Sequence, residues 1–220
     1  ILQTGQVPGT VWLLMLLALL AALAQSLQSW QRHPSLPSAA WEGVKVLAPP
    51  LAVSLATLLA APLPFSLLVQ AGLSVAIVTC FGPLVYRLAY QSLADASSLV
   101  LLIVSVGVHF AMTGLGLLFF GAEGFRNPPF WDERFQLGAV ALGGQALIVA
   151  LVCAALMVLL WLFFERTLYG KALRATAINR LGARLMGISS QAAGQLTLSM
   201  AAFIGALSGL LIGPTTTVFY

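Results

Sequence analysis

The chain has 220 residues, of which 60% are hydrophobic and only 7% are charged, and its formal net charge is +4. A soluble domain usually carries about 25% charged residues, so a chain with this few cannot cover a water-facing surface and must lie mostly in lipid. The positive charge does not indicate a nucleic-acid-binding protein, because the basic residues flank apolar segments, as they do in membrane proteins.

Apolar stretches of membrane-spanning length recur along the chain, separated by charged or proline-containing connectors. A transmembrane helix needs about 20 apolar residues. The long uncharged stretch between Lys45 and Arg87 divides into two spans at Pro62 and Pro64, because proline disfavours helix at and before its own position. We therefore predict an all-α fold, a polytopic transmembrane helix bundle in a single domain, residues 1–220. Its approximate six spans are residues 11–27, 46–61, 65–86, 99–120, 137–164 and 196–212.

Two of these spans have unusual features. The second span, 46–61, would hold Pro49 and Pro50 in its first turn, where a missing backbone N–H costs little. The fifth, 137–164, is longer than the bilayer requires, so it would have to tilt or extend beyond the membrane.

The charge of the connecting loops predicts the orientation of the spans. The loop at 121–134 carries two basic and three acidic residues, whereas the loop at 165–190 carries Glu165 as its only acid. Lys and Arg are retained on the cytoplasmic side, so we predict that the loop 165–190 faces the cytoplasm and the loop 121–134 faces outward. The basic residues of the cytoplasmic loop are Arg166, Lys171, Arg174, Arg180 and Arg184.

Few residues of the chain are suited to chemistry. Gly170-Lys171 is followed by Ala172, so it does not form a Walker A phosphate-binding loop. No cluster has metal-ligand spacing and no Ser/His/Asp trio is suggested, so we expect no catalytic residue, metal or cofactor. His109 is the one ionisable group predicted within a span. Such a residue is a functional candidate, but a neutral histidine bonded to a neighbouring helix is the simpler interpretation.

Small and amide side chains in the spans suggest sites of helix packing. Gly205, Gly209 and Gly213 are spaced four apart on one face of the last predicted span. Such a glycine ridge lets another helix approach closely, either from the same bundle or from a second subunit. Gln70 and Gln145 lie near the predicted outer ends of their spans, where we expect helix–helix hydrogen bonds rather than ligand contacts.

The predicted cytoplasmic loop is longer than a turn requires. Residues 171–177 are rich in helix-forming residues, and Asn179, Gly182 and Gly187 then interrupt them. We predict two short helices with a bend near residues 179–182. Two interpretations remain open for this loop: a basic segment on anionic lipid headgroups, or a docking element for a cytoplasmic partner.

The same loop carries a family resemblance. The run from Arg166-Thr167 through Gly170-Lys171-Ala172-Leu173-Arg174-Ala175, continued by Ala183-Arg184-Leu185-Met186-Gly187-Ile188, resembles the cytoplasmic loop of branched-chain amino acid ABC importer permeases. It is most similar to the LivH-type subunit, and the resemblance extends over about residues 86–220. The family's usual N-terminal motif and its final glycine-rich spans are not visible, so we expect a fragment of a longer protein.

The resemblance implies a permease subunit in a bacterial inner (plasma) membrane. Such a subunit works with a second permease subunit, two cytoplasmic ATP-binding subunits and a periplasmic or extracellular substrate-binding protein. It would not be an enzyme itself, since ATP hydrolysis takes place on the partners. Residues that contact the substrate are not identified.

We predict that ATP-driven motion enters through this loop, because it is cytoplasmic by charge, has helix-forming composition without a span, and matches the family's loop. A docking helix needs small and apolar residues in the partner's cleft and a polar contact at its rim. The predicted ATPase-coupling residues are Arg174, Asn179, Ala183, Arg184, Leu185, Gly187 and Ile188.

Two other classes of membrane protein fit the composition. A secondary, ion-coupled carrier would use its basic loop to contact lipid, and a structural membrane subunit of a larger complex would need no pathway. A proton-coupled carrier usually has a carboxylate within the membrane, and the predicted spans contain none. Co-purification with an ATPase would favour the importer, and dependence on an ion gradient without ATP would favour the carrier.

The orientation can be tested with single introduced cysteines. A cysteine at Asn127 should react with a membrane-impermeant thiol reagent applied from outside, whereas a cysteine at Arg180 should be protected, because the positive loop is retained inside. The reverse labelling pattern would contradict both the orientation and the assignment of the coupling loop.

Overall fold

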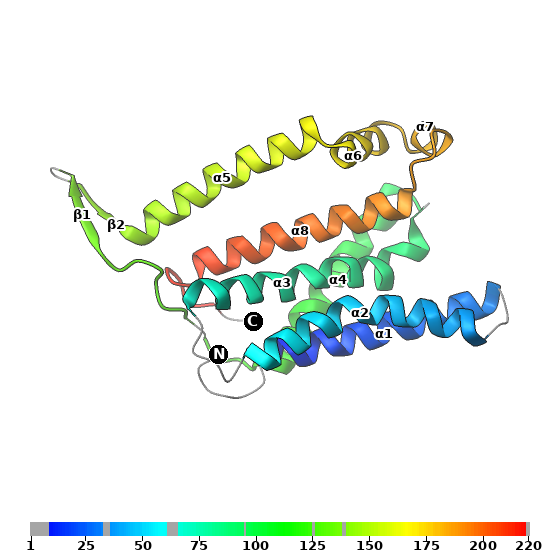
Figure 1. Cartoon of the computed structure of the whole chain (residues 1–220), viewed down its shortest axis with the longest axis horizontal. Coiled ribbons are helices and arrows are strands. Elements are labelled where there is room, and N and C mark those ends of the chain that lie inside the picture. Colours follow the sequence, from blue (N-terminus) through cyan, green and yellow to red (C-terminus); the bar gives the residue numbers. More distant parts are fainter. Residues whose placement is uncertain are drawn as a thin grey trace. The chain divides into compact units, whose positions relative to one another are not determined.

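A computed structural model describes residues 9–32, 36–60, 66–94, 96–124, 126–137 and 140–218, with only the backbone described at 32, 36–39, 134–137 and 140–142. Over these described residues the fold is all-α apart from one short hairpin (Figure 1). Six helices in the described ranges are long and apolar enough to cross a membrane, which confirms the predicted number of spans. They are α1 (Gly9–Arg32), α2 (Leu36–Ala60), α3 (Leu67–Val85), α4 (Ser98–Phe120), α5 (Gly144–Arg166) and α8 (Ser190–Ile212).

The residues group into two compact units. The first contains α1 to α4 and residues 194–207 of α8, and the second contains residues 124–193 and 208–219. The loop helices α6 (Leu168–Ile178) and α7 (Arg180–Leu185) belong to the second unit.

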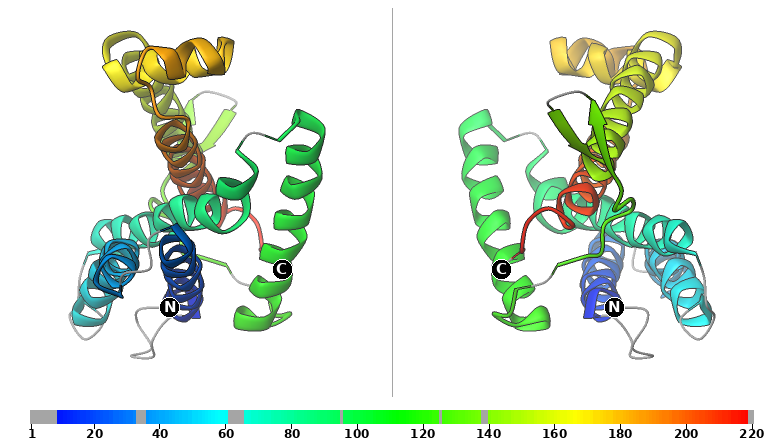
Figure 2. Two further views of the ribbon diagram at one scale, coloured as in Figure 1. Left: turned by 90° about the vertical axis from the view of Figure 1, so that its right-hand side faces the viewer. Right: turned by 90° about the vertical axis from the view of Figure 1, so that its left-hand side faces the viewer.

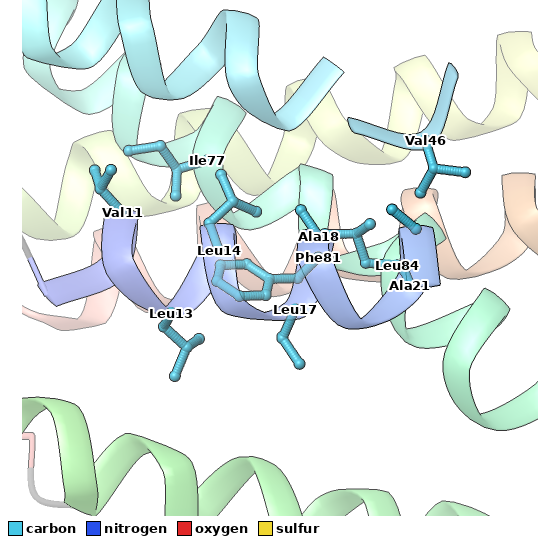
Figure 3. Close-up of a cluster of buried hydrophobic side chains, with 11 residues drawn as sticks. Val11, Leu13, Leu14, Leu17, Ala18, Ala21, Val46, Ile77, Phe81 and Leu84 are labelled. Carbon is cyan, nitrogen blue, oxygen red and sulfur yellow. The ribbon is translucent and has the colours of Figure 1, made fainter. Parts of the chain in front are cut away.

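Helix α1 forms the centre of the first unit, where it packs along α2 and also contacts α3 and α4 (Figures 1 and 2). Leu14, Ala18 and Ala21 of α1 are completely buried. Val46 of α2 and Phe81 of α3 belong to the same cluster (Figure 3). In lipid, helices associate through van der Waals packing, so small residues such as these alanines bring α2 and α3 close to α1.

Helix α2 begins ten residues before the predicted span, so the prediction that Pro49 and Pro50 lie in its first turn is wrong. Both prolines lie inside the helix. The polar connector before them is also helical, and Lys45 pairs with Glu42 one turn earlier at 2.8 Å. Proline removes helix hydrogen bonds, which neighbouring groups can compensate within a membrane bundle. One turn beyond the prolines, the buried Ser54 hydroxyl donates to the carbonyl of Pro50 at 2.7 Å.

Helix α3 crosses α8 at a point where the two backbones touch. A Cβ atom at Gly82 would overlap the carbonyl oxygen of Leu198 and lie 2.7 Å from Cα of Ser199. A Cβ atom at Gly194 of α8 would overlap the ring of Tyr86. Tyr86 begins the π-helical turn η2 (Tyr86–Tyr90), and the 3-10 turn η3 (Gln91–Leu93) follows. Glycine on each helix therefore permits this contact.

The start of the fifth predicted span is wrong, because Leu137 and residues 140–143 lie in strands rather than in a helix. Strands β1 (Arg134–Leu137) and β2 (Val140–Gly143) pair antiparallel, with Arg134 opposite Gly143, and α5 begins only at Gly144. Adjacent glycines are poor helix formers, and the amide of Gly144 donates instead to the carbonyl of Glu133 at 2.8 Å. The shortened helix has 23 residues, which suffices to span a bilayer without unusual tilt.

The α3–α8 crossing predicts a difference between two glycine-to-alanine variants. Gly82→Ala should destabilise the protein by about 1–3 kcal/mol, because the added methyl group meets backbone atoms that must shift. Gly114→Ala on α4 is the control, since open space surrounds that position and alanine favours helix. Thermal unfolding of the detergent-purified protein compares the two. Equal midpoints would contradict a close crossing at Gly82.

Candidate functional site

The segment between α5 and α8 consists of two short helices, α6 and α7, that meet at Asn179 (Figure 1). This confirms the predicted pair of helices and the bend. Each helix start has a side-chain cap. Thr167 accepts from the amide of Gly170 at 3.0 Å, Asn179 accepts from Gly182 at 3.0 Å, and Ser189 accepts from Ala192 at 3.3 Å at the start of α8. Polar caps thus divide the segment into its helices.

Gly187 ends α7 in a left-handed conformation, with φ of +82°. The amide of Gly187 donates to the carbonyl of Arg184 at 3.0 Å, and that of Ile188 donates to Ala183 at 2.9 Å. This pair of bonds is the usual glycine C-cap of a helix. No described side chain or backbone atom lies within 4 Å of a Cβ built at Gly187, so glycine is required by its backbone conformation rather than by lack of space.

Large apolar side chains of this segment are exposed. Leu181 and Leu185 lie four residues apart on one face of α7, and 70% and 81% of their surfaces are accessible. Ile178 and Met186 flank them and are exposed as well. Ala183, by contrast, is buried inside the segment, so it does not offer a contact surface. We call Ile178, Leu181, Leu185 and Met186 the apolar face of the segment. Exposed apolar patches are typical of interaction surfaces.

The two arginines predicted to contact a partner both make contacts within the chain. Arg174 donates through Nη1 to the Glu165 carboxylate at 3.1 Å and through Nη2 to the carbonyl of Phe164. Arg184 donates through Nε to the hydroxyl of Ser190 at 2.8 Å. These bonds join α6 to the end of α5 and α7 to the start of α8.

At the opposite end of α5, the buried side chain of Gln145 joins three segments. Its Nε2 donates to the carbonyl of Leu211 on α8 at 3.0 Å, and its Oε1 accepts from the amide of Phe130 at 3.1 Å. The expected helix–helix hydrogen bond of Gln145 is thereby confirmed. Because a side-chain amide has both a donor and an acceptor, one residue can hold the loop and α8 together.

A pocket of about 680 Å³ lies beside Gln145. Sequence reasoning did not predict it, although the clustering of Asn127, Pro128, Pro129 and Trp131 in one loop was visible. Its wall includes a cation, Arg126, whose Nε donates to the carbonyl of Pro214 at 3.1 Å. Its lining residues are Arg126, Asn127, Pro128, Pro129, Trp131, Asp132, Glu133, Gly143, Gly144, Gln145, Pro214 and Thr215.

The other candidate residues are not gathered into a site. Within the described part of the chain, no neighbouring atom lies within 4 Å of a Cβ built at Gly205 or Gly209. A Cβ built at Gly213 would lie 2.9 Å from Nδ2 of Asn127. The first two glycines of the ridge are therefore uncovered here. His109 is exposed on α4, and its ring lies 5.7 Å from that of Phe110 rather than against a polar group of the described residues.

The chain is similar to known transport proteins. The pattern of the family described as branched-chain amino acid transport system / permease component matches residues 11–220. Among curated proteins, the high-affinity branched-chain amino acid transport system permease protein BraD of Pseudomonas aeruginosa is 25% identical over 155 residues, covering 68% of this chain and 50% of BraD. The LivH permease protein of Escherichia coli K12 is 25% identical over 154 residues, covering 67% and 50%.

The chain spans about half the length of these curated relatives. No solved structure shows significant similarity to it. The family match begins at residue 11, just after the start of α1, and covers the rest of the six candidate spans and the α6–α7 segment. This multi-pass membrane protein therefore belongs to the family of branched-chain amino acid transport system permease components.

Proposed function

We propose that the chain forms part of the permease subunit of an ATP-binding cassette importer in a bacterial inner (plasma) membrane. It would line part of the translocation pathway for branched-chain or related amino acids. The observation that carries this proposal is the family match over residues 11–220, which includes the six candidate spans. The relatives BraD and LivH are named as permease proteins of high-affinity branched-chain amino acid transport systems, which supports the solute class.

We further propose that residues 1–220 act as a single transmembrane permease domain without enzymatic activity. The partners of this domain would be a second permease subunit, two cytoplasmic ATP-binding subunits and a periplasmic or extracellular substrate-binding protein. Hydrolysis of ATP would take place on the ATP-binding subunits. The apolar face of the α6–α7 segment supports this set of partners, because Leu181 and Leu185, which are 70% and 81% accessible, would gain stability when a second protein covers them.

The two ends of α5 suggest how such a permease would be oriented. The helix has 23 residues, so it is roughly 35 Å long at about 1.5 Å per residue. The basic α6–α7 segment follows one end, and the pocket beside Gln145 lies at the other. This length matches the hydrocarbon core of a bilayer, about 30 Å thick. If the basic segment is cytoplasmic, the pocket opens on the external side, where a substrate-binding protein would dock.

In this proposal the ATP-binding subunits act on the spans through the α6–α7 segment. Leu181 and Leu185 would seat in a cleft of the ATP-binding subunit, while Gly187 and Ser189 direct the chain from α7 into α8. Movement of the cleft on ATP binding would then displace the segment. Because α5 and α8 continue directly from its two ends, the displacement reaches two spans at once.

A charge placed in the apolar face tests the proposed function. Leu185→Asp should reduce the ATPase activity stimulated by loaded substrate-binding protein at least about tenfold, because a carboxylate in a desolvated contact lacks a partner. Leu185→Met keeps the apolar contact and serves as the matched control. The measurement is ATPase activity of the reconstituted complex with and without loaded binding protein. Full stimulation of Leu185→Asp in an assembled complex would favour a lipid-facing loop, as in an ion-coupled carrier.

The two uncovered glycines of α8, Gly205 and Gly209, give a second test, directed at the second permease subunit. Gly209→Leu should weaken association of the two permease subunits, since a branched side chain would separate the closely packed helices by overpacking worth about 1–3 kcal/mol. Ile212→Leu, at an exposed position off the ridge, should have little effect. Crosslinking of the subunits in membranes measures the association. Equal crosslinking yields in both variants would show that the ridge faces lipid.

A further inference from the structure

The junction between α5 and α6 is unusually tight. Helix α5 ends at Arg166 and α6 begins at Leu168, so one residue, Thr167, separates them. Gly170 is buried in the first turn of α6, and a Cβ atom there would overlap the carbonyl oxygen of Phe163 and lie 2.7 Å from Cα of Phe164. Only a residue without a side chain allows the first turn of α6 to rest on the last turn of α5.

Thr167 bonds to both helices at once. Its hydroxyl donates to the carbonyl of Phe163 on α5 at 2.6 Å and accepts from the amide of Gly170 on α6 at 3.0 Å. Its backbone amide also donates to the carbonyl of Phe163, at 3.2 Å. The end of one helix and the start of the next are therefore fixed to the same side chain, and no flexible linker lies between them.

Arg174 closes the junction from the second turn of α6. Its guanidinium reaches back to the Glu165 carboxylate and to the carbonyl of Phe164, both in the last turn of α5. An exposed ion pair contributes little by itself, and about half of each side chain is accessible here. The second bond adds to the ion pair, because a planar guanidinium with two fixed acceptors holds one orientation, and a cation is favoured at the C-terminal end of a helix.

We propose that Gly170 and Arg174 are positioning residues that make α5 and α6 one rigid elbow, and that Arg174 acts through this elbow rather than as a contact for the ATP-binding subunit. The inference rests on the proposed function. A push that reaches α6 then turns α5 directly, since neither steric freedom nor a linker at their junction absorbs it. The junction between α6 and α7 differs, because Asn179 is exposed and holds α7 by a single cap.

Charge reversal in the assembled transporter tests the elbow. Glu165→Arg and Arg174→Glu should each leave the ATP-binding subunits bound but lower the amount of amino acid transported per ATP hydrolysed by a factor between about 2 and 30, the usual range for altered coupling between sites. The double variant, Glu165→Arg with Arg174→Glu, restores an ion pair across the junction but not the bond to the Phe164 carbonyl, so it should recover only part of the loss. If Arg174 had a purely local structural role, the double variant would not recover the amount of amino acid transported per ATP hydrolysed.

A second measurement reports the elbow itself. Spin labels at the exposed positions Trp161 on α5 and Ala177 on α6 should give a narrow distance distribution in the complex, which Gly170→Ala should shift or broaden. Gly114→Ala, in open space on α4, is the matched control and should leave the distribution unchanged.

Three outcomes distinguish this inference from the proposed function. Loss of the ATP-binding subunits in Arg174→Glu would make Arg174 a docking contact and overturn the elbow. An unchanged transport ratio in both single variants, within a complex that Leu185→Asp does inactivate, would overturn the elbow and leave the proposed function standing. A complex that Leu185→Asp does not affect would remove the proposed function, and the elbow proposal with it.

Discussion

The constraint on which this structure depends is that backbone polar groups find no water in lipid. Each unsatisfied N–H or C=O group inside the hydrocarbon is expensive, so a spanning chain remains helical and leaves the helix only where other groups satisfy its ends. Between the spans, in the α6–α7 segment, side chains satisfy the helix starts, since Thr167, Asn179 and Ser189 each cap the helix that follows. Within the spans, hydroxyl groups such as that of Ser54 bond to their own helix.

The way the helices pack also depends on lipid as the solvent. Lipid is as apolar as a leucine side chain, so helices gain little by hiding apolar surface and associate where their shapes allow close approach. Glycine supplies that approach at the α3–α8 crossing, through Gly82 and Gly194, and at the α5–α6 elbow, through Gly170. Each of these three positions would place a Cβ atom against backbone or ring atoms of a neighbouring element. Gly205 and Gly209 have the same sequence pattern but meet nothing among the described residues.

Charged residues have two roles in this chain. Their distribution between loops predicts which side of the membrane each loop faces. The basic residues of the α6–α7 segment also organise it locally, since Arg174 bonds to the end of α5 and Arg184 to the start of α8. With these two arginines bonded inside the chain, the proposed docking surface is the apolar face, which includes Leu181 and Leu185. In the proposed importer, the ATP-binding subunit would move the segment through its contact with the apolar face. The bonds of Arg174 and Arg184 would then pass this movement to α5 and α8.

Much of this could be predicted from the sequence, because span length and charge asymmetry are local properties. Six spans, a cytoplasmic-type basic loop and its two short helices follow from apolar stretches of about 20 residues and from interruptions such as Asn179. The family resemblance rested on the same loop. Only the tertiary structure decided where α2 and α5 begin, because helix starts depend on neighbouring contacts, such as the bond from Gly144 to Glu133. It also decided the roles of single loop residues. Ala183 is buried and Arg174 is turned back onto α5, and no spacing in the sequence reveals which way a side chain on a short helix faces until the helix is seated against its neighbour.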